Sequence, residues 1–558
     1  MVLPVVLGGL ALLIAGYVVW GRRVELLLGV EPDRPTPALT ETDGLDYVPT
    51  SPWVLLGHHF SSIAGAGPIV GPVIAAAAFG WLPAVAWIVL GSILIGGVQD
   101  FSTLVASVRH RARSVGEMAR EEISPRARLL FLVFVWLTLV YVIVVFLDLT
   151  AATFARHPGV ATSSTLYIVL AVVTGLAIYR TRVGLVRASV VAVPLVFVSI
   201  WLGERWPMIL PVDDPQTVFN LALLVYCLVA SVLPVWLLLQ PRDYLSSWLL
   251  YATLGAGVLG VLLGGGRPDA GADPLPAFLG FRDAGLGLLF PAMFITIACG
   301  ACSGFHTIVS SGTTAKQLRS ERHARPIAYG SMLLEALLAL LAVSAVVVVG
   351  LGAARESAPT VVFAEGLGRI VGALGIPREL GVHFGALAIS TFLLTTLDTC
   401  TRLARYVLEE LFHLRRGRAA TALLATAGTL VLPFVLTRIT LHLPDGSPAP
   451  AWKVIWPVFG ATNQLLGALG MMAVLAWLRN LGRRRAFLAW PMAFMFTVTL
   501  IALGQLVWRH GPASLVGGVA TLLFALAVVL LAEALRHFAR SPAGSAGGGE
   551  LSAPAPSR

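Results

Sequence analysis

The sequence predicts an all-α protein, a polytopic transmembrane bundle of about 15 helices in which some helices are discontinuous. Of the 558 residues, 57% are hydrophobic and only 12% are charged, whereas about a quarter of an ordinary soluble domain is charged. Apolar runs long enough to cross a bilayer recur along the chain. Three of these runs also contain polar residues and glycine that a helix serving only as an anchor has no reason to contain, and the second of the fifteen runs is typical of a broken membrane helix.

Fifteen apolar runs match a hydrocarbon core about 30 Å thick, which takes roughly 20 helical residues. Helices are expected because an open sheet would leave unpaired backbone groups in lipid. The predicted spans are 3–20, 53–79, 84–106, 129–149, 164–179, 188–203, 218–239, 244–264, 284–312, 327–351, 383–401, 419–437, 453–478, 486–508 and 514–535.

The positively charged residues predict the orientation of the bundle. If successive loops alternate sides, one set of loops, which includes 240–243 and 402–418, holds 29 of the 39 Lys and Arg residues. Because such residues stay cytoplasmic during insertion, we expect the N-terminus outside and the C-terminus in the cytoplasm. The first run is interpreted as an anchor helix, with a cleaved signal peptide as the alternative.

The net charge of +10 fits contact with anionic membrane lipids better than binding to nucleic acid, which is not expected as a partner. The four cysteines lie in apolar runs and are predicted to form no disulfides. Cys299, Cys302 and His306 have a C-x2-C spacing but no second pair of ligands. We therefore predict no metal site and no cofactor.

Three spans carry polar residues where a lipid-facing helix has no use for them. In the second span, histidines and serines precede a Gly- and Pro-rich stretch, which predicts an unwound segment between two half-helices. The ninth span is expected to hold hydroxyl groups at its cytoplasmic end, and the thirteenth contains Thr462, Asn463 and Gln464. The alternative is close helix packing, with hydroxyls bonded to their own backbone.

Unwound carbonyls with hydroxyl groups suit Na⁺, and exposed half-helix N-termini suit a carboxylate. The candidate substrate- or ion-binding residues are His58, His59, Ser61, Ser62, Gly65, Gly67, Ser303, His306, Ser310, Ser311, Thr313 and Asn463.

The spacing of interruptions predicts an inverted repeat. The seventh span, five spans after the second, runs in the opposite direction and is expected to be interrupted at Ser231 and Pro234. This fits two five-helix units of the LeuT type. We predict an anchor helix and loop at 1–52, a transport core at 53–401 with units at about 53–203 and 218–401, further helices at 402–535, and a disordered tail at 536–558.

Three acids are candidates for a proton relay or gate, because a buried carboxylate tends to take up a proton. Glu335 has no basic residue three or four positions away, which favours a functional role. For Asp398, a helix-end ion pair with Arg402 at i+4 is an equal alternative. Asp100 is equally well explained as a gate residue or as an interfacial acid.

Several long strings resemble the carbon starvation protein A (CstA) family. They are HHFSSIAGAGPIVGP at 58–72, GWLPAVAWIVLGSILIGGVQDF at 80–101, QPRDYLSSWLL at 240–250, ACGACSGFHTIVSSGTTAKQL at 298–318, TTLDTCTRLARY at 395–406 and WPVFGATNQLLGALG at 456–470. The resemblance implies a bacterial inner-membrane transporter used in carbon starvation, for peptides or for pyruvate with protons. It also implies that the site includes the candidate residues on these strings.

The favoured function is therefore a symporter for a small carboxylate, pyruvate first, coupled to H⁺, with Na⁺ as the alternative ion. Uptake of di- and tripeptides is the runner-up, because a peptide also ends in a carboxylate. We expect no enzyme, since the sequence has no HExxH pair, GxSxG elbow or P-loop. The oligomeric state does not follow from the sequence.

Overall fold

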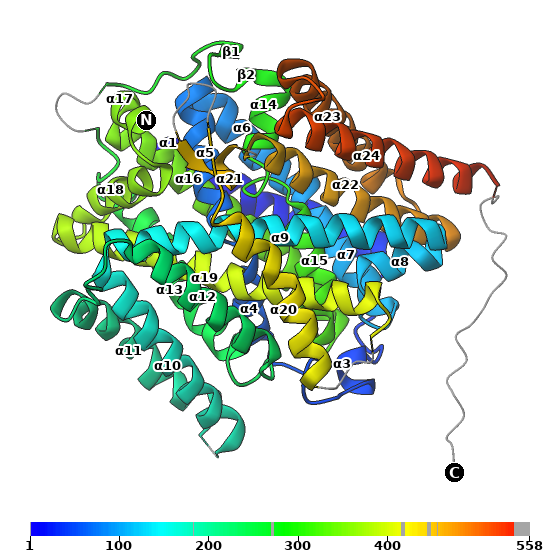
Figure 1. The fold of residues 1–558 in the computed structure, drawn as a ribbon, viewed down its shortest axis with the longest axis horizontal. Helices are drawn as coiled ribbons and strands as arrows, with labels where there is room; N and C mark the ends of the chain where they lie inside the picture. Colours follow the sequence, from blue (N-terminus) through cyan, green and yellow to red (C-terminus); the bar gives the residue numbers. More distant parts are fainter. Residues whose placement is uncertain are drawn as a thin grey trace.

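The computed structural model describes residues 2–181, 183–268, 273–414, 419–442, 448–454 and 456–540. Within these ranges, 13 helical segments are long and apolar enough to span a membrane, and one bent pair of helices passes the same test together. Figure 1 shows a bundle whose long helices, such as α9 (Pro125–Arg156) and α24 (Leu515–Arg540), run along one common direction. The all-α polytopic fold is confirmed.

The first part of the chain alternates long helices with short connecting turns. Two spans continue through a π-helical turn without losing their direction, at η1 and η2. The elements before α9 are α1 (Val2–Ala15), η1 (Gly16–Gly21), α2 (Arg22–Leu28), α3 (Pro37–Thr40), α4 (Pro52–Ile63), α5 (Gly67–Phe79), α6 (Trp81–Gly91), η2 (Ser92–Gly96), α7 (Gly97–Arg109) and α8 (Val115–Glu122).

The middle part begins with a helical hairpin and ends in a second long helix, α19. Its elements are α10 (Pro158–Arg180), α11 (Leu185–Arg205), α12 (Pro215–Val232), α13 (Leu239–Leu262), β1 (Arg282–Asp283), β2 (Gly287–Leu288), α14 (Leu289–Thr296), α15 (Gly304–Gly312), η3 (Thr314–Lys316), η4 (Glu321–His323), η5 (Arg325–Tyr329), α16 (Gly330–Val349), α17 (Leu351–Glu356), α18 (Pro359–Gly372) and α19 (Arg378–Leu411).

The last part adds α20 (Ala419–Leu436), β3 (Thr440–His442), β4 (Pro448–Pro450), α21 (Ala451–Val454), α22 (Trp456–Asn480), α23 (Ala486–His510) and α24. The two β-hairpins, β1 with β2 and β3 with β4, are antiparallel. The predicted disordered tail was placed too early, because residues 536–540 complete α24 and Phe538 receives a hydrogen bond from Arg479. The rest of that prediction lies outside the described residues.

The second predicted span is discontinuous, as expected. α4 ends at Ile63, α5 begins at Gly67, and the two helices meet at an angle of 43°. Pro68 accounts for the break, since proline has no N–H for the preceding turn and disfavours helical geometry in the residue before it. The two histidines lie in the helical part, so the unwound stretch is shorter than its Gly-rich sequence indicates.

The ninth span differs from the expected single helix. It consists of two short helices, α14 and α15, separated by residues 297–303, and Ser303 at the start of α15 is extended. The segment IACGACS has no proline and is largely apolar, so its hydropathy resembles that of a helix. The second discontinuous segment is therefore here.

The seventh span was predicted to be interrupted, and this prediction was wrong. α12 is one helix that ends at Val232, and Pro234 lies in the connection to α13. Residues 240–243, predicted as a loop, form the first turn of α13 and are buried. Pro234 marks the end of the span and not a break within it, because proline cannot continue a helix.

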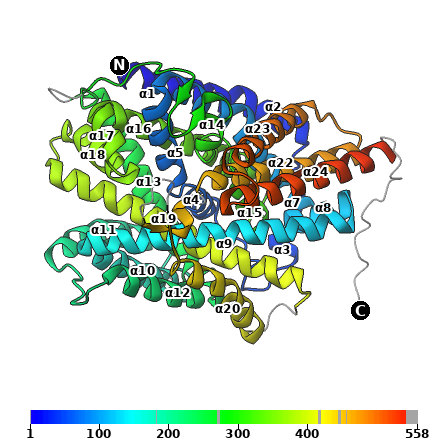
Figure 2. The same ribbon diagram turned by 45° about the horizontal axis from the view of Figure 1, so that its top comes forward.

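The two discontinuous segments pack against each other in the middle of the bundle: α14 against α5, and α15 against α4. Glycines permit this approach, because a Cβ on Gly67 would lie 2.4 Å from the Cys299 sulfur and a Cβ on Gly71 would lie 2.2 Å from the Thr296 carbonyl oxygen. α9 and α19 pack along each other, as Figures 1 and 2 show, and α10 and α11 form a hairpin at one margin.

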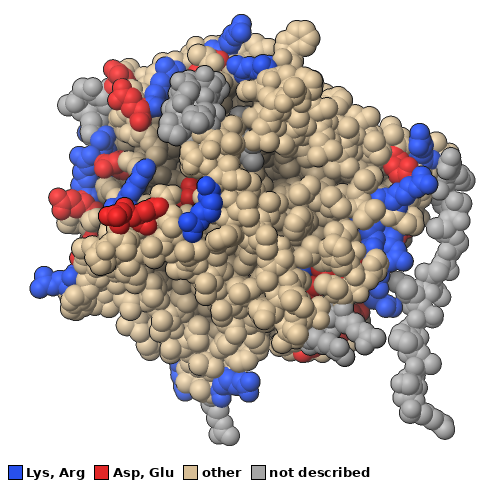
Figure 3. Space-filling view, in the orientation of Figure 1, with Lys and Arg blue, Asp and Glu red and all other residues tan. Residues whose placement is uncertain are grey.

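The surface has a broad uncharged band. In Figure 3 most Lys, Arg, Asp and Glu side chains gather toward the two ends of the long helices, with tan surface between them. Large apolar side chains such as Val186, Val190 and Leu424 are exposed along the outer helices. This distribution is that of a membrane-spanning protein, with an apolar belt facing lipid and charges at both ends.

Candidate functional site

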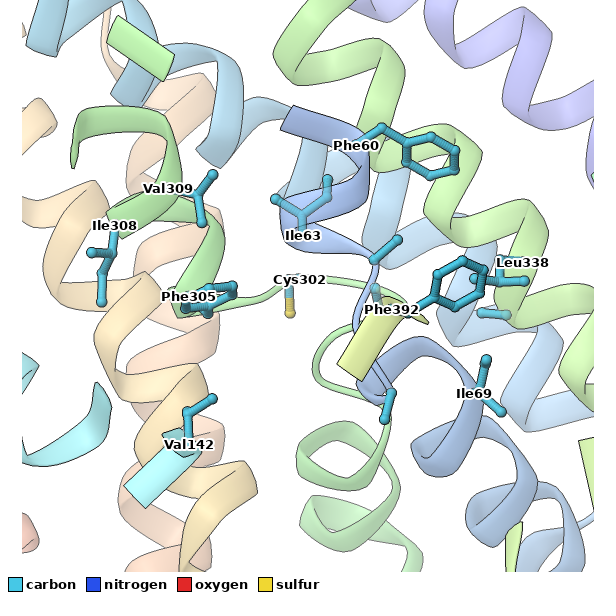
Figure 4. Close-up of a cluster of buried hydrophobic side chains, with 14 of the residues drawn as sticks. Phe60, Ile63, Ile69, Val142, Cys302, Phe305, Ile308, Val309, Leu338 and Phe392 are labelled. Carbon is cyan, nitrogen blue, oxygen red and sulfur yellow. The ribbon is translucent and has the colours of Figure 1, made fainter. Parts of the chain in front are cut away.

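The meeting point of the two breaks is enclosed by apolar side chains. Figure 4 shows Phe60 and Ile63 before the first break, Ile69 after it, and Cys302 and Phe305 beside the second. All five side chains are buried. Buried polar groups next to this packing are shielded from water, so their charges interact strongly with one another.

One buried cluster joins an imidazole to two carboxylates from three helices. His306 Nδ1, from the first turn of α15, lies 2.9 Å from Asp100 Oδ2 of α7. His306 Nε2 lies 3.1 Å from Glu335 Oε2 of α16. All three side chains are fully buried. We call this cluster the acid–histidine triad.

The triad is incompletely hydrogen-bonded. Within the described part of the chain, Asp100 Oδ1 and both Glu335 oxygens have no hydrogen-bond partner, and His306 Nε2 is close to Glu335 without being aligned for a hydrogen bond. Two carboxylates facing one imidazole leave an excess negative charge even when the histidine is protonated. Burying such a charge is unfavourable unless a proton or a cation neutralises it.

A second buried cluster is centred on Arg242 in the first turn of α13. Its guanidinium donates to Asp243 Oδ1 at 2.5 Å and to Asp398 of α19. It also donates to the Tyr226 hydroxyl at 2.8 Å and to the Thr395 carbonyl at 3.2 Å. The Arg242 donors are thus satisfied, although Asp398 Oδ1 has no hydrogen-bond partner in the described residues.

Asp398 does not pair with Arg402, which was one of its two predicted interpretations. Its Oδ2 accepts from Arg242 and from the Tyr226 hydroxyl, the latter at 2.7 Å. Arg402 instead donates to the carbonyls of Ala230 and Leu233 at the end of α12. The i+4 spacing allows an ion pair between Asp398 and Arg402, but Asp398 pairs with a buried arginine of another helix, Arg242.

The neighbouring histidines of α4 face different partners. His58 Nδ1 lies 2.6 Å from Asp243 Oδ2, and Ser62 donates to the same oxygen at 3.4 Å. His59 Nδ1 lies 2.8 Å from the Thr314 hydroxyl. In the described residues, His59 Nε2 and the Ser61 hydroxyl have no hydrogen-bond partner. His58 therefore joins the Arg242 cluster, while His59 keeps an unused polar atom.

The N-terminus of α15 is held by α7 and α22. Asn463 Oδ1 accepts from the Phe305 backbone N–H at 3.0 Å and from the Ser303 hydroxyl at 3.2 Å. Gln99 donates to the Thr307 hydroxyl at 2.9 Å and to the Ser303 carbonyl. Asn463 thus caps α15, which positions His306 in the first turn of the helix.

The hydroxyl residues at the end of α15 divide into two groups. Ser311 donates to the Thr307 carbonyl at 2.8 Å and Thr313 to the Val309 carbonyl at 3.1 Å, so both bond to their own backbone, as the packing alternative predicts. Ser310 is buried with no hydrogen-bond partner for its hydroxyl among the described residues. A Cβ on Gly65 would lie 2.8 Å from the Thr396 hydroxyl oxygen and 3.1 Å from the Phe146 ring.

Four residues of these clusters were not selected from the sequence: Gln99, Tyr226, Arg242 and Asp243. Arg242 and Asp243 lay in a predicted loop of four residues, where charged residues are common and do not indicate a functional site. A signal was available, since the polar string QPRDY, with two adjacent charges of opposite sign, leads directly into the apolar run that follows it. Adjacent charges of opposite sign at the start of a membrane helix are candidates for a buried ion pair.

No metal site is indicated by the described residues. They contain no group of three or more His, Cys, Asp or Glu side chains arranged to hold a metal ion. Cys299 and Cys302 lie instead near Asn463 and Gln464, whose amide nitrogens are 3.5 Å and 3.7 Å from the two sulfurs.

Comparisons with known proteins agree with this architecture. The family profile described as carbon starvation protein CstA matches residues 1–356 and 349–502. The peptide transporter CstA of Escherichia coli K12 is 34% identical, covering 89% of this chain and 80% of the relative. The pyruvate/proton symporter BtsT of the same strain is 31% identical, covering 88% and 79%. The peptide transporter CstA of Bacillus subtilis 168 is 30% identical, covering 96% and 97%.

A solved structure has a similar fold. A crystal structure of the Eremococcus coleocola manganese transporter superposes with a TM-score of 0.52 and 12% sequence identity. It covers 89% of this chain and 98% of the transporter chain. At this identity the likeness concerns the fold alone.

Proposed function

Because the chain belongs to the carbon starvation protein CstA family and is a multi-pass membrane transporter, we propose that it is a symporter that imports a small carboxylate with H⁺ during carbon starvation. Pyruvate is the first candidate substrate. The membrane is the bacterial inner membrane, with the N-terminus outside and the C-terminus in the cytoplasm. Transporter relatives also agree with the absence of an enzymatic role.

The observation that carries this proposal is the acid–histidine triad beside the two breaks. Asp100, His306 and Glu335 are fully buried and hold one imidazole between two acids. When His306 is already protonated, the cluster becomes close to neutral on gaining one further proton. It therefore supplies a proton site directly against the half-helix α15, which has to move if the two halves of a transporter rock about a central ligand.

The substrate carboxylate is assigned to the N-terminal end of α5. Partial positive charge at a helix N-terminus favours an anion. The corresponding end of α15 is less available, because Asn463 already accepts from the Phe305 N–H. His59 and Ser61, each with an unused polar atom in the described structure, lie on α4 just before the break that leads to α5.

The repeat is proposed with shifted boundaries. If its two units each begin with a discontinuous segment, the first starts at α4 and the second at α14. Each unit then continues through a π-helical turn, at η2 and η5, and reaches a long helix, α9 or α19. The α10–α11 hairpin becomes an insertion in the first unit.

Peptide uptake is the second candidate, supported by the names of the CstA relatives. A di- or tripeptide ends in a carboxylate and could use the same helix end. Its amine would need an acidic partner, for which the triad carboxylates are available. A site for peptides therefore differs in volume from a site for pyruvate. It also differs in the role of Asp100 and Glu335, which would bind the peptide amine in the first case and the coupling proton in the second.

The test is uptake of labelled pyruvate by proteoliposomes of the full chain, with an imposed pH gradient, an imposed Na⁺ gradient or neither. We expect accumulation driven by the pH gradient, with no competition from unlabelled di- and tripeptides. Accumulation of labelled peptides without pyruvate uptake would replace the first candidate by the second. Accumulation that follows only the Na⁺ gradient would contradict proton coupling.

A further inference from the structure

Residues 29–51, which we call the strap, cross the end of the bundle where α4 begins. The strap joins α2 to α4 and contacts several elements far apart in sequence. Arg109 at the end of α7 donates to the Gly29 carbonyl at 3.0 Å, and the Val235 N–H donates to the Leu45 carbonyl at 3.3 Å. Thr50 forms an isolated parallel β-bridge with Leu318. The strap thus closes over the connection that follows α15.

The carboxylate of Asp46 in the strap contacts two groups of the bundle, and the positive charge of Lys316 acts on it as well. Arg402 NH1 lies 3.4 Å from Asp46 Oδ1, and the Tyr406 hydroxyl donates to the same oxygen. The Lys316 ammonium lies 3.9 Å from the centre of the Tyr406 ring and 5.6 Å from that of Tyr47. Burial by itself raises the pKa of Asp46, but the charges of Lys316, Arg402 and Arg405 and the Tyr406 hydrogen bond lower it overall.

The receiving groups belong to the bundle and are more buried than the acid they hold. The side chain of Arg402 is 2% exposed, whereas that of Asp46 is 24% exposed. Arg405 pairs with Glu409 at 3.0 Å. The cluster therefore brings the cations Lys316, Arg402 and Arg405 together around the acids Asp46 and Glu409. Removal of Asp46 would leave buried positive charge uncompensated.

Two buried donors in this cluster are unused. In the described structure, Arg402 Nε and Arg405 Nε have no hydrogen-bond partner. A small cavity adjoins the cluster between α8, α15 and α19, and its lining includes Ser311, Lys316 and Tyr406. The cluster therefore lies next to the end of α15, on the side of the breaks that the strap covers.

We propose that Arg402, Lys316 and Tyr406 form a second carboxylate-binding site, separate from the N-terminal end of α5, which Asp46 occupies in this state and a small carboxylate solute occupies when the strap opens. A guanidinium, an ammonium and a phenol hydroxyl are together a typical receptor for one carboxylate. Asp46 is the chain's own carboxylate in that receptor. The assignment of the solute class rests on the proposed function, whereas the exchange of Asp46 does not require transport.

The test uses the purified full chain in detergent and measures its unfolding temperature against increasing acetate or pyruvate. Acetamide serves as the neutral probe and chloride as the ionic-strength control. In Asp46→Ala and in the isosteric Asp46→Asn, we expect a saturable rise with either carboxylate that exceeds the rise in the unchanged protein, because a ligand of the folded state stabilises it. Glu41→Ala removes an exposed acid of the same strap and is the matched control.

Further variants identify the receptor. Arg402→Gln combined with Asp46→Asn is expected to weaken the carboxylate effect about tenfold, which corresponds to about one charge-assisted hydrogen bond. Arg402→Lys should retain part of it, and Lys316→Met tests the ammonium if the Arg402 variants do not fold. Equal responses to carboxylate in Asp46→Asn, Glu41→Ala and the unchanged protein would overturn the proposal.

The two proposals fail separately. Carboxylate-dependent stabilisation of Asp46→Asn without any pyruvate uptake would keep this site and reject the transported substrate. Pyruvate uptake driven by the pH gradient, with no carboxylate effect on Asp46→Asn, would keep the function and reject the site.

Discussion

At the scale of single residues, the two buried clusters differ in how far their hydrogen bonds are satisfied. Arg242 has an acceptor for each of its nitrogens, from Asp243, Asp398, Tyr226 and nearby carbonyls. Among the two acids of this cluster, Asp398 Oδ1 has no partner in the described structure, whereas the triad has three such oxygens, Asp100 Oδ1 and both oxygens of Glu335. A satisfied ion network holds helices together, whereas an unsatisfied one has capacity for a proton. We therefore assign a structural role to Arg242 and coupling to Glu335.

The first prediction concerns Glu335→Gln. A glutamine has nearly the same shape but cannot release a proton, so pyruvate accumulation driven by a pH gradient is expected to fall at least about tenfold, a loss of about 1.4 kcal/mol of coupling. Exchange of labelled for unlabelled pyruvate across the membrane, which needs no net proton movement, should persist. Both rates are measured in the same proteoliposomes.

The control for this variant is Glu365→Gln. Glu365 lies on α18 in a partly exposed pair with Arg378, at 2.8 Å, and such pairs contribute little. Its uptake should match that of the unchanged protein. Full pH-driven accumulation by Glu335→Gln would exclude Glu335 as the proton carrier.

At the scale of elements, the decisive feature is how closely the broken helices approach each other. The break at 64–66 follows from Pro68 and the surrounding glycines, and it was predictable from the sequence. The break at 297–303 was not, because it has no proline and its residues are small and mostly apolar. Packing against α22, through Asn463 and Gly304, stabilises that break from outside the segment.

The second prediction concerns Gly71→Ala. Its Cβ would lie 2.2 Å from the backbone carbonyl oxygen of Thr296, which cannot move aside as a flexible side chain can. We expect a loss of about 1–3 kcal/mol of stability, as for overpacked cores, seen as a lower unfolding temperature and lower transport. Gly8→Ala is the control, since a Cβ there meets nothing within 4 Å in the described structure. Equal unfolding temperatures for the two variants would contradict close packing of α5 and α14.

The positions of three arginines within helices correct the count of loop charges from which the orientation was predicted. Arg242, Arg402 and Arg405, counted as loop residues in the prediction of orientation, lie buried in α13 and α19. They report on internal ion pairs and not on the membrane surface. The predicted orientation therefore rests on the remaining loop residues and stays a prediction.

At the scale of the whole molecule, both ends of the α4–α5 segment are covered. On the strap side, Thr50 pairs with Leu318. On the opposite side, the backbone of 276–279 forms hydrogen bonds with residues 79–82, such as the Leu82 N–H to the Ala277 carbonyl at 3.0 Å. If transport requires the two ends to open in turn, the strap contacts must break in each cycle.

The third prediction uses a cross-link across the strap. Thr50→Cys with Leu318→Cys places two cysteines on paired strands, whose separation of about 4.8 Å is compatible with a disulfide. Oxidation is expected to stop pyruvate uptake, and a reductant should restore it, since α4 would be tied to the segment after α15. The control pair is Arg282→Cys with Leu288→Cys, partners within the β1–β2 hairpin. Unchanged uptake by a fully cross-linked strap would show that this end need not open.

The amino-acid sequence was enough to predict the fold class, most of the spans and the first broken helix. These follow from local composition, because lipid requires long apolar helices and because proline and glycine interrupt them. The family was identified from the resemblance of several long sequence strings. Glu335, Asp398 and the histidines also stood out, since a charge within an apolar run is visible in one dimension. The pairing of the charges is visible only in three dimensions: His306 lies with Asp100 and Glu335, Asp398 with Arg242 and not Arg402, and Asp46 with Arg402. The partner of a buried ion depends on which opposite charge lies close to it on another helix and on how far both groups are removed from water. Contacts of this kind produce no periodic pattern in the sequence.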